Sequence, residues 1–278
     1  GILSVRKTFI GFTPNEHSLK LNHIINSSSK SKLLFADSCG GIINSSNEFS
    51  DWYNMSYSMG VPEEFLNDLI LILNKKRNIK EVLILLDEVS LFEFYKAHEK
   101  QALRKVVDLN SFERFQYLFL LPNIDIVRAI FRSYSKDITI EKSIEFDIYN
   151  SGSFIESNFL YDFSEIQCEE RVSEKINYTS GLTDLFDTKL YVLQQIKSLC
   201  EKNSIKVTFA SQPFSSKYFL TGFRVSSYFK FLNYANHKGF KIIKPTKCLI
   251  IEHNEGQWRD LHHYNWVIGS EISKNLLN

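Results

Sequence analysis

The chain has 278 residues, of which 33 are basic and 32 acidic, so its formal net charge is +1. A nearly neutral chain has no broad electrostatic attraction for nucleic acid or an anionic membrane, so we expect no nucleic acid partner. Hydrophobic residues make up 44% of the chain, which excludes an intrinsically disordered protein. The length suits one domain, since single hydrophobic cores stop growing at roughly 250–300 residues.

Short β-branched or aromatic segments alternate along the chain with longer amphipathic segments, a pattern typical of βαβ units around a parallel sheet. The expected strands are 32–38, 52–58, 81–87, 206–212 and one near 241–251. The expected helices are 14–25, 62–76, 184–203, 222–237 and 265–277. The sequence therefore predicts an α/β fold, a three-layer α/β/α sandwich with a flavodoxin-like parallel sheet of about five strands.

Residues from about 94 to 180 break this alternation. Helical and strand signals are mixed there, and no βαβ spacing is visible. We predict that 1–278 form a single domain in which 94–180 are an insertion or cap.

Ser38 is the first candidate for chemistry. It ends the apolar segment LLFADS and precedes Gly40 and Gly41. In an open parallel sheet, ligands bind beyond the carboxyl ends of the strands, and glycine lets a substrate approach the backbone closely. The segment is equally compatible with a plain strand-ending turn. Cys39 is an alternative nucleophile, although its side chain points elsewhere in a turn.

A serine nucleophile needs a base, and the sequence offers one near its C-terminal end. A serine hydroxyl reacts poorly until a histidine removes its proton, and a carboxylate helps by fixing the histidine tautomer. Asp260 precedes His263 by three residues, just before a predicted helix. The Asp260 carboxylate can bend back to Nδ1 of His263, which leaves Nε2 facing the serine. His262 is the alternative base, but the Asp-x-x-His spacing favours His263.

We expect neither a metal nor a cofactor. His253, His262 and His263 lack an H-x-x-x-H helix pair and an accompanying carboxylate at ligand spacing. Trp258, beside the predicted catalytic loop, is a candidate for stacking on a sugar ring. Gln212, at the end of the fourth predicted strand, is expected to line the same pocket.

The four cysteines show no C-x-x-C spacing, so they predict neither a zinc knuckle nor a small disulfide scaffold. The cysteine spacing therefore does not indicate whether the protein resides in an oxidising or a reducing compartment. No segment approaches the roughly 18–20 apolar residues of a membrane span. The sequence begins with Gly1 rather than methionine, so we expect a trimmed chain, and whether a signal or anchor preceded Gly1 stays open.

Four segments fall in one order along the chain: FADSCGG around Ser38, YNMSYSMG ending at Gly60, ILLD ending at Asp87, and DLHHYNWVIG starting at Asp260. In order and approximate spacing they resemble the SGNH, or GDSL-like, hydrolase superfamily. The first third of the chain is similar to the extracytoplasmic branch associated with O-acetylation of bacterial polysaccharides and D-alanylation of teichoic acid.

The resemblance implies that Ser38 is the nucleophile, His263 the general base and then acid, and Asp260 the residue that orients His263. It also implies an oxyanion hole made by the Ser38 N–H, a glycine N–H after the second strand and an asparagine after the third. Gly60 is the best match for the glycine, with Ser58 as the alternative.

Two positions depart from the pattern of this superfamily. Asn54 precedes Gly60 by one residue more than expected, and we treat it as a candidate for substrate binding. The third strand ends in Leu86-Asp87-Glu88, where the superfamily has Gly-x-Asn-Asp, so an asparagine donor is missing. Removing one oxyanion donor typically costs about 100–1,000-fold in rate.

The implied function is serine-dependent acyl transfer on esters. We expect an O-acetyltransferase acting on a bacterial surface polysaccharide, with a glycan acceptor, an acyl-ester donor and a membrane acyltransferase partner. The expected location is periplasmic or extracytoplasmic at a membrane, and a native start near Gly1 would favour the cytoplasm. Two alternatives stay open: a carbohydrate or lipid esterase of the same superfamily, and a catalytically decayed glycan-binding module.

Overall fold

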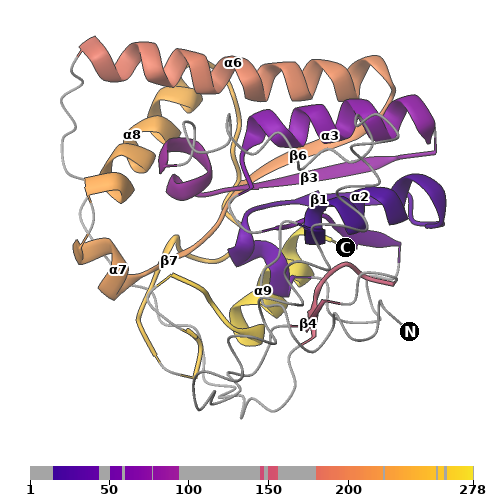
Figure 1. The fold of residues 1–278 in the computed structure, drawn as a ribbon. Coiled ribbons are helices and arrows are strands. Elements are labelled where there is room, and N and C mark those ends of the chain that lie inside the picture. The colour runs from indigo at the N-terminus through magenta and orange to yellow at the C-terminus, as the bar shows by residue number, and fades with distance from the viewer. Residues whose placement is uncertain are drawn as a thin grey trace, which may run out of the picture.

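The computed structural model describes residues 15–43, 51–57, 60–76, 78–93, 145–146, 150–155, 180–221, 223–254, 256–259 and 262–277. Its centre is a four-stranded parallel sheet with the strand order β2-β1-β3-β6 (Figure 1). The strands are β1 (Lys32–Phe35), β2 (Trp52–Asn54), β3 (Glu81–Leu86) and β6 (Lys206–Ser211). The predicted α/β fold is confirmed, and the order corresponds to the first four strands of a flavodoxin-like sheet.

The sheet divides the core into two layers of side chains. Successive residues of a strand point to opposite faces, so Leu33 and Phe35 of β1 belong to one cluster while Leu34 and Ala36 belong to the other. In β3, five of the six residues are buried, as expected for a strand covered on both faces. This double burial explains why the strands appear in the sequence as nearly continuous apolar runs.

Helices cover both faces of the sheet. The first face packs against α2 (Asn15–Asn26), α3 (Pro62–Lys75), α6 (Ser180–Lys202) and α8 (Phe223–His237). The second packs against α9 (Trp266–Leu276) and the segment that precedes it. Figure 1 shows α3 and α6 on one side of the sheet and α9 on the other. None of the helices in the described ranges is both long and apolar enough to span a membrane.

Local signals explain where the helices begin and end. Pro62 occupies the first turn of α3, where its missing N–H costs nothing, and Lys75 lies in the last turn, where positive charge complements the helix dipole. The side chain of Asn265 caps α9 by accepting a hydrogen bond from the Val267 N–H at 3.0 Å. The predicted helices therefore agree with the structure to within a few residues.

The fifth predicted strand, near 241–251, is not one strand in the structure. Ile243 forms a single parallel bridge with Ala210, and the chain then bends. Pro245, which has no N–H to donate to a strand ladder, lies at this bend. Further on, β8 (Ile250–Ile251) pairs with β7 (Phe214–Ser215), just before the short helix α7 (Ser216–Thr221).

Most of the predicted insertion, 94–180, lies outside the described residues. The described part contains the antiparallel pair β4 (Glu145–Phe146) and β5 (Phe154–Ile155). Gly152 between them has a φ of +72°, and a Cβ there would lie 2.3 Å from the carbonyl oxygen of Asn54. This glycine therefore lets the segment pack directly against the end of β2.

His17 is buried, although its neighbours in the sequence are polar. It is only 3% exposed, and its Nε2 lies 2.5 Å from Oδ2 of Asp68 on α3. Its ring stacks on Tyr57 with 4.0 Å between the ring centroids. His17 shares the helical spacing of Leu21 and Ile24, so it occupies the buried face of α2 and joins that helix to α3.

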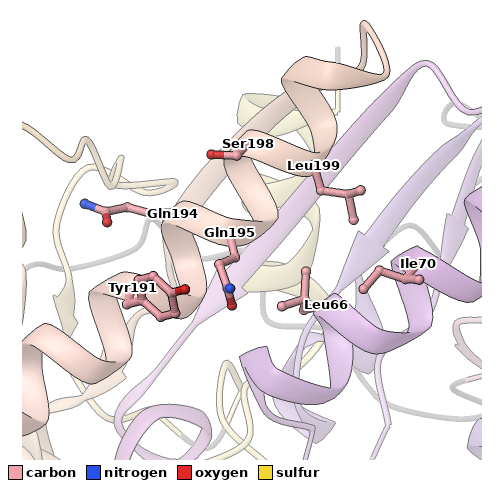
Figure 2. Close-up of a pocket in the computed structure, with 7 residues that line it drawn as sticks. All are labelled: Leu66, Ile70, Tyr191, Gln194, Gln195, Ser198 and Leu199. Carbon is pink, nitrogen blue, oxygen red and sulfur yellow. The ribbon is translucent and has the colours of Figure 1, made fainter.

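A groove of about 440 Å³ runs between α3 and α6 on the outer side of the helical layer. It is lined by Leu66, Ile70, Tyr191, Gln194, Gln195, Ser198 and Leu199 (Figure 2). The lining residues all come from these two helices and none from the ends of the strands. The groove is thus separate from the edge of the sheet at which Ser38 lies.

Adjacent positions of α3 provide a test of this packing. Leu69 is fully buried, so Leu69→Ala should lower the free energy of unfolding by about 2–5 kcal/mol. Ile70 is 40% exposed, and Ile70→Ala should lower it by less than about 1 kcal/mol. Urea unfolding followed by circular dichroism measures both values. Equal losses in the two variants would contradict the assigned orientation of α3.

Candidate functional site

Ser38 lies in a tight turn directly after β1. The 3-10 helix η1 (Ser38–Ile42) begins at this serine, and Asp37 caps it by accepting a hydrogen bond from the Cys39 N–H at 2.9 Å. A Cβ on Gly40 would lie 2.3 Å from the Cβ of Ala36. The turn therefore requires glycine at position 40, and it holds Ser38 at the carboxyl edge of the sheet.

The side chain of Ser38 meets that of His263. Oγ of Ser38 and Nε2 of His263 are 3.0 Å apart, although the residues are 225 positions apart in the sequence. Both residues are partly exposed. Of the two adjacent histidines, it is thus His263 that faces the serine, through the nitrogen that the sequence predicts. Asp260, the predicted orienting carboxylate, lies outside the described residues.

The loop that carries His263 is held by hydrogen bonds between its own residues. Trp258 and Tyr264 form an antiparallel bridge, and the Arg259 N–H donates to the His263 carbonyl at 2.8 Å. The Trp258 ring is 3% exposed and packs edge-on against Tyr264 at 6.2 Å. A buried ring offers no open face to a sugar, so the prediction that Trp258 stacks on substrate is not supported. Trp258 supports the loop instead.

Asn54 forms hydrogen bonds to the backbone of the Ser38 turn. It is fully buried, and its Nδ2 donates to the carbonyls of Gly40 at 2.8 Å and Ile43 at 2.7 Å. Its Oδ1 accepts from the Ser56 N–H at 2.8 Å. Asn54 thus holds the Ser38 turn in place through hydrogen bonds. The sequence assigned Asn54 to substrate binding and did not predict this structural role.

The predicted oxyanion donors have different surroundings. Ser38 is the first residue of η1, a position whose N–H has no acceptor within the helix. The Gly60 N–H donates to the Tyr57 carbonyl at 3.2 Å, so in this conformation it is used within the chain. Ser58 lies outside the described residues. The oxyanion role of Gly60 stays a prediction.

Beside the Ser38 turn lies a group of residues that we call the acidic cluster: Asp37, Asp87, Glu88 and His262. The three carboxylate residues are at most 1% exposed, and the His262 side chain is 22% exposed. Nε2 of His262 lies 3.7 Å from Oδ2 of Asp37 and 3.7 Å from Oδ2 of Asp87. Nδ1 of His262 lies 3.8 Å from Oε1 of Glu88.

Gln212 connects the acidic cluster to the core. Its Nε2 donates to Oδ1 of Asp37 at 2.9 Å and lies 3.4 Å from Oδ2 of Asp87. Its Oε1 accepts from the Tyr264 hydroxyl at 2.8 Å. The prediction that Gln212 lies at the same sheet edge as Ser38 is confirmed, but the side chain is 1% exposed and contacts the two carboxylates.

Burial and mutual repulsion divide the charge among the carboxylates. Burial raises the pKa of Asp37, but the interaction with His262 and the hydrogen bonds of Asp87 and Gln212 outweigh it, so this pKa lies below its ordinary value. Burial, and then the charges of Asp37 and Glu88, raise the pKa of Asp87 well above its usual range. Burial also raises the pKa of Glu88, although the charge of His262 partly opposes it. Asp37 is therefore the preferred bearer of negative charge.

The acidic cluster was missed in the sequence as a site. Asp37, Cys39, Asp87 and His262 bring donor atoms within 4.8 Å of one another. The sequence argument against a metal considered only carboxylates close to the histidines along the chain. A usable signal existed, because acidic residues directly follow two apolar strands, and the carboxyl ends of neighbouring parallel strands meet at one edge.

No protein-family model matches the chain, and no curated protein sequence is significantly similar to it. The resemblance to the SGNH superfamily therefore rests on the short sequence segments alone. Function has to be argued from the geometry around Ser38.

Asn54 provides a test of how the Ser38 turn is held. Asn54→Asp replaces the buried Nδ2 donor by an acceptor and leaves the Gly40 and Ile43 carbonyls without it. Each lost buried partner costs about 1–3 kcal/mol, so the free energy of unfolding should fall by at least about 2 kcal/mol. Asn67→Asp, at an exposed position of α3, is the control and should change it by less than about 0.5 kcal/mol. Equal stability of the two variants would exclude the supporting role.

Proposed function

We propose that this chain performs serine-dependent acyl transfer on esters, with Ser38 as nucleophile and His263 as general base and then acid. The observation that carries the proposal is the 3.0 Å separation between Oγ of Ser38 and Nε2 of His263. This separation is within the range at which a base can remove a hydroxyl proton. The pair also lies at the carboxyl edge of a parallel sheet, where such folds bind ligands.

The mechanism follows from the chemistry of the pair. The neutral His263 imidazole accepts the hydroxyl proton through Nε2 as Oγ of Ser38 attacks the ester carbonyl carbon. The C–O bond of the ester then breaks, and the leaving alcohol takes the proton from the imidazolium. An acyl group remains on Ser38. A second hydroxyl, activated in the same way, accepts the acyl group and restores the serine.

The remaining parts of the machinery belong to the proposal. Asp260 would accept the Nδ1–H of His263 and so hold the Nε2 lone pair toward the serine. The N–H groups of Ser38 and Gly60 would stabilise the oxyanion, and Gly60 would have to turn its N–H away from the Tyr57 carbonyl. Asp87 and Glu88 follow β3 in place of an asparagine donor, so we expect slow chemistry.

We further propose that the acceptor is a sugar hydroxyl of a bacterial surface polysaccharide, acetylated outside the cytoplasm with a membrane acyltransferase as partner. The resemblance to the O-acetylation branch supports this choice. Cys248 takes part in a disulfide bond, as is common in proteins of oxidising compartments. Both points favour a periplasmic or extracytoplasmic transferase over a cytoplasmic esterase.

A fluorophosphonate probe tests the nucleophile. We expect covalent labelling of Ser38, located by mass spectrometry of the digested protein, and none in Ser38→Ala. Labelling of His263→Gln should be at least about 100-fold slower, because the base is lost. Ser198→Ala, at an exposed position of α6, is the matched control and should label like the parent chain. Labelling that persists in Ser38→Ala, or none in the parent chain, would reject the mechanism and favour a glycan-binding module.

The acceptor is tested with p-nitrophenyl acetate as donor, in the presence and absence of an oligosaccharide. A transferase should yield an oligosaccharide that is heavier by one acetyl group, together with faster release of nitrophenol. This expectation follows because an acceptor hydroxyl that binds at the acyl-enzyme competes with water. Release that is unaffected by the oligosaccharide, with free acetate as the only product, would identify an esterase.

A further inference from the structure

The acidic cluster brings together three buried carboxyl groups around one histidine. Asp37, Asp87 and Glu88 are buried together, and within the described ranges no lysine or arginine pairs with any of the three. Neither carboxylate oxygen of Glu88 has a partner with strict hydrogen-bond geometry among the described residues, although the nearby Tyr218 hydroxyl interacts with this carboxylate and opposes the rise of its pKa. Buried carboxylates are usually paired with a cation or ligate a metal, because isolated charge in a protein interior is costly.

The distances within the acidic cluster are slightly longer than those between ligand atoms around one ion. Nε2 of His262 lies 3.7 Å from one oxygen of Asp37 and 3.7 Å from one oxygen of Asp87. Hydrogen bonds between such atoms are about 2.7–3.2 Å long. A tetrahedral metal with bonds of about 2.0–2.2 Å separates its nitrogen and oxygen ligands by about 3.3–3.6 Å. The separations are thus too long for hydrogen bonds and close to those of metal ligands.

The other oxygens of the two aspartates fix their orientation. Oδ1 of Asp37 accepts from the Cys39 N–H and from Gln212, both at 2.9 Å. Oδ1 of Asp87 accepts from the Ser90 N–H at 2.7 Å. Oδ2 of Asp37 is therefore left facing His262, and Oδ2 of Asp87 faces both His262 and Nε2 of Gln212, which is 3.4 Å away. Hydrogen bonds from neighbouring groups commonly hold metal ligands in place in this way before the ion binds.

His262 is also oriented as a metal ligand would be. Its Nε2 faces the two aspartates, while its Nδ1 faces the buried Glu88 carboxylate at 3.8 Å. Histidines that bind a metal through one ring nitrogen commonly present the other to a carboxylate, which fixes the tautomer. The 3.8 Å separation is longer than a hydrogen bond, so Glu88 would orient His262 through the attraction of their opposite charges.

We propose that Asp37, Asp87 and His262 bind a divalent metal ion, with the Cys39 thiolate as fourth ligand. A set of one nitrogen, one sulfur and two oxygen donors suits zinc better than the hard cations calcium and magnesium. Binding transfers the Cys39 proton, the proton on Nε2 of His262 and any proton held by the carboxylates to the solvent, and no electron is exchanged. The site is argued from its own geometry and does not rest on acyl transfer.

The ion would join the two segments that carry Ser38 and His263. Asp37 and Cys39 flank Ser38, and His262 precedes His263. Without an ion, the acidic cluster can lower its charge by keeping Asp87 and Glu88 protonated. The two states differ in a measurable way, because only the first requires a metal and releases protons when the metal is added.

Zinc binding to the whole chain tests the proposal. After treatment with EDTA and removal of the chelator, calorimetric titration with zinc chloride should show one ion per chain, with a heat that depends on the ionisation enthalpy of the buffer. Zinc should also raise the melting temperature by at least about 3 °C, since it binds only the folded chain. Magnesium and calcium should do neither. No zinc binding by the parent chain would overturn the site.

Variants locate the ion. His262→Gln and Asp87→Asn should weaken zinc binding at least about 100-fold, while His253→Gln should leave it unchanged, since His253 bonds to Ser215 instead. Undiminished binding in both ligand variants would overturn the proposal. If these variants fail to fold, the cobalt spectrum of the parent chain decides, because a tetrahedral site with a thiolate gives intense visible bands and a sulfur charge-transfer band. Cys39→Ser should lose the latter band alone.

Discussion

The parallel pairing of β1 with β3 is the constraint on which the rest of the structure depends. Leu34 is in register with Leu83, and Phe35 with Ile84, so the two strands end side by side. Asp37 and Ser38 follow one strand, and Asp87 follows the other. A shift of one residue would turn the side chains of a strand to the opposite face and expose the apolar set. Hydrophobic burial therefore fixes the register, and the register brings the polar groups together.

Much of the fold can be read from the sequence because its signals are local. The apolar spacing of 62–75 and the continuous run of 81–86 each describe a single element and the faces it buries. The prediction near 241–251 was wrong because Pro245 interrupts the ladder, so that only Ile243 bridges to β6. Helical spacing, rather than the polarity of its neighbours, likewise accounts for the burial of His17.

The candidate site could be predicted only in part, since its contacts depend on tertiary structure. The pairing of Ser38 with His263 was accessible because the chemistry of a serine nucleophile requires such a partner. The hydrogen bonds of Asn54 to the turn and the burial of Trp258 could not be predicted, because each depends on which part of the backbone packs against the side chain. The acidic cluster likewise forms only once neighbouring strands and a distant loop meet.

His262 and His263 are adjacent in the sequence, but their side chains contact different groups. Their rings are nearly perpendicular, with an angle of 84° between the planes, and only His263 reaches Ser38. Because the two residues are adjacent, a backbone rotation that moves one histidine ring also moves the other. The fit of His263 to Ser38 and the fit of His262 to the acidic cluster are therefore coupled.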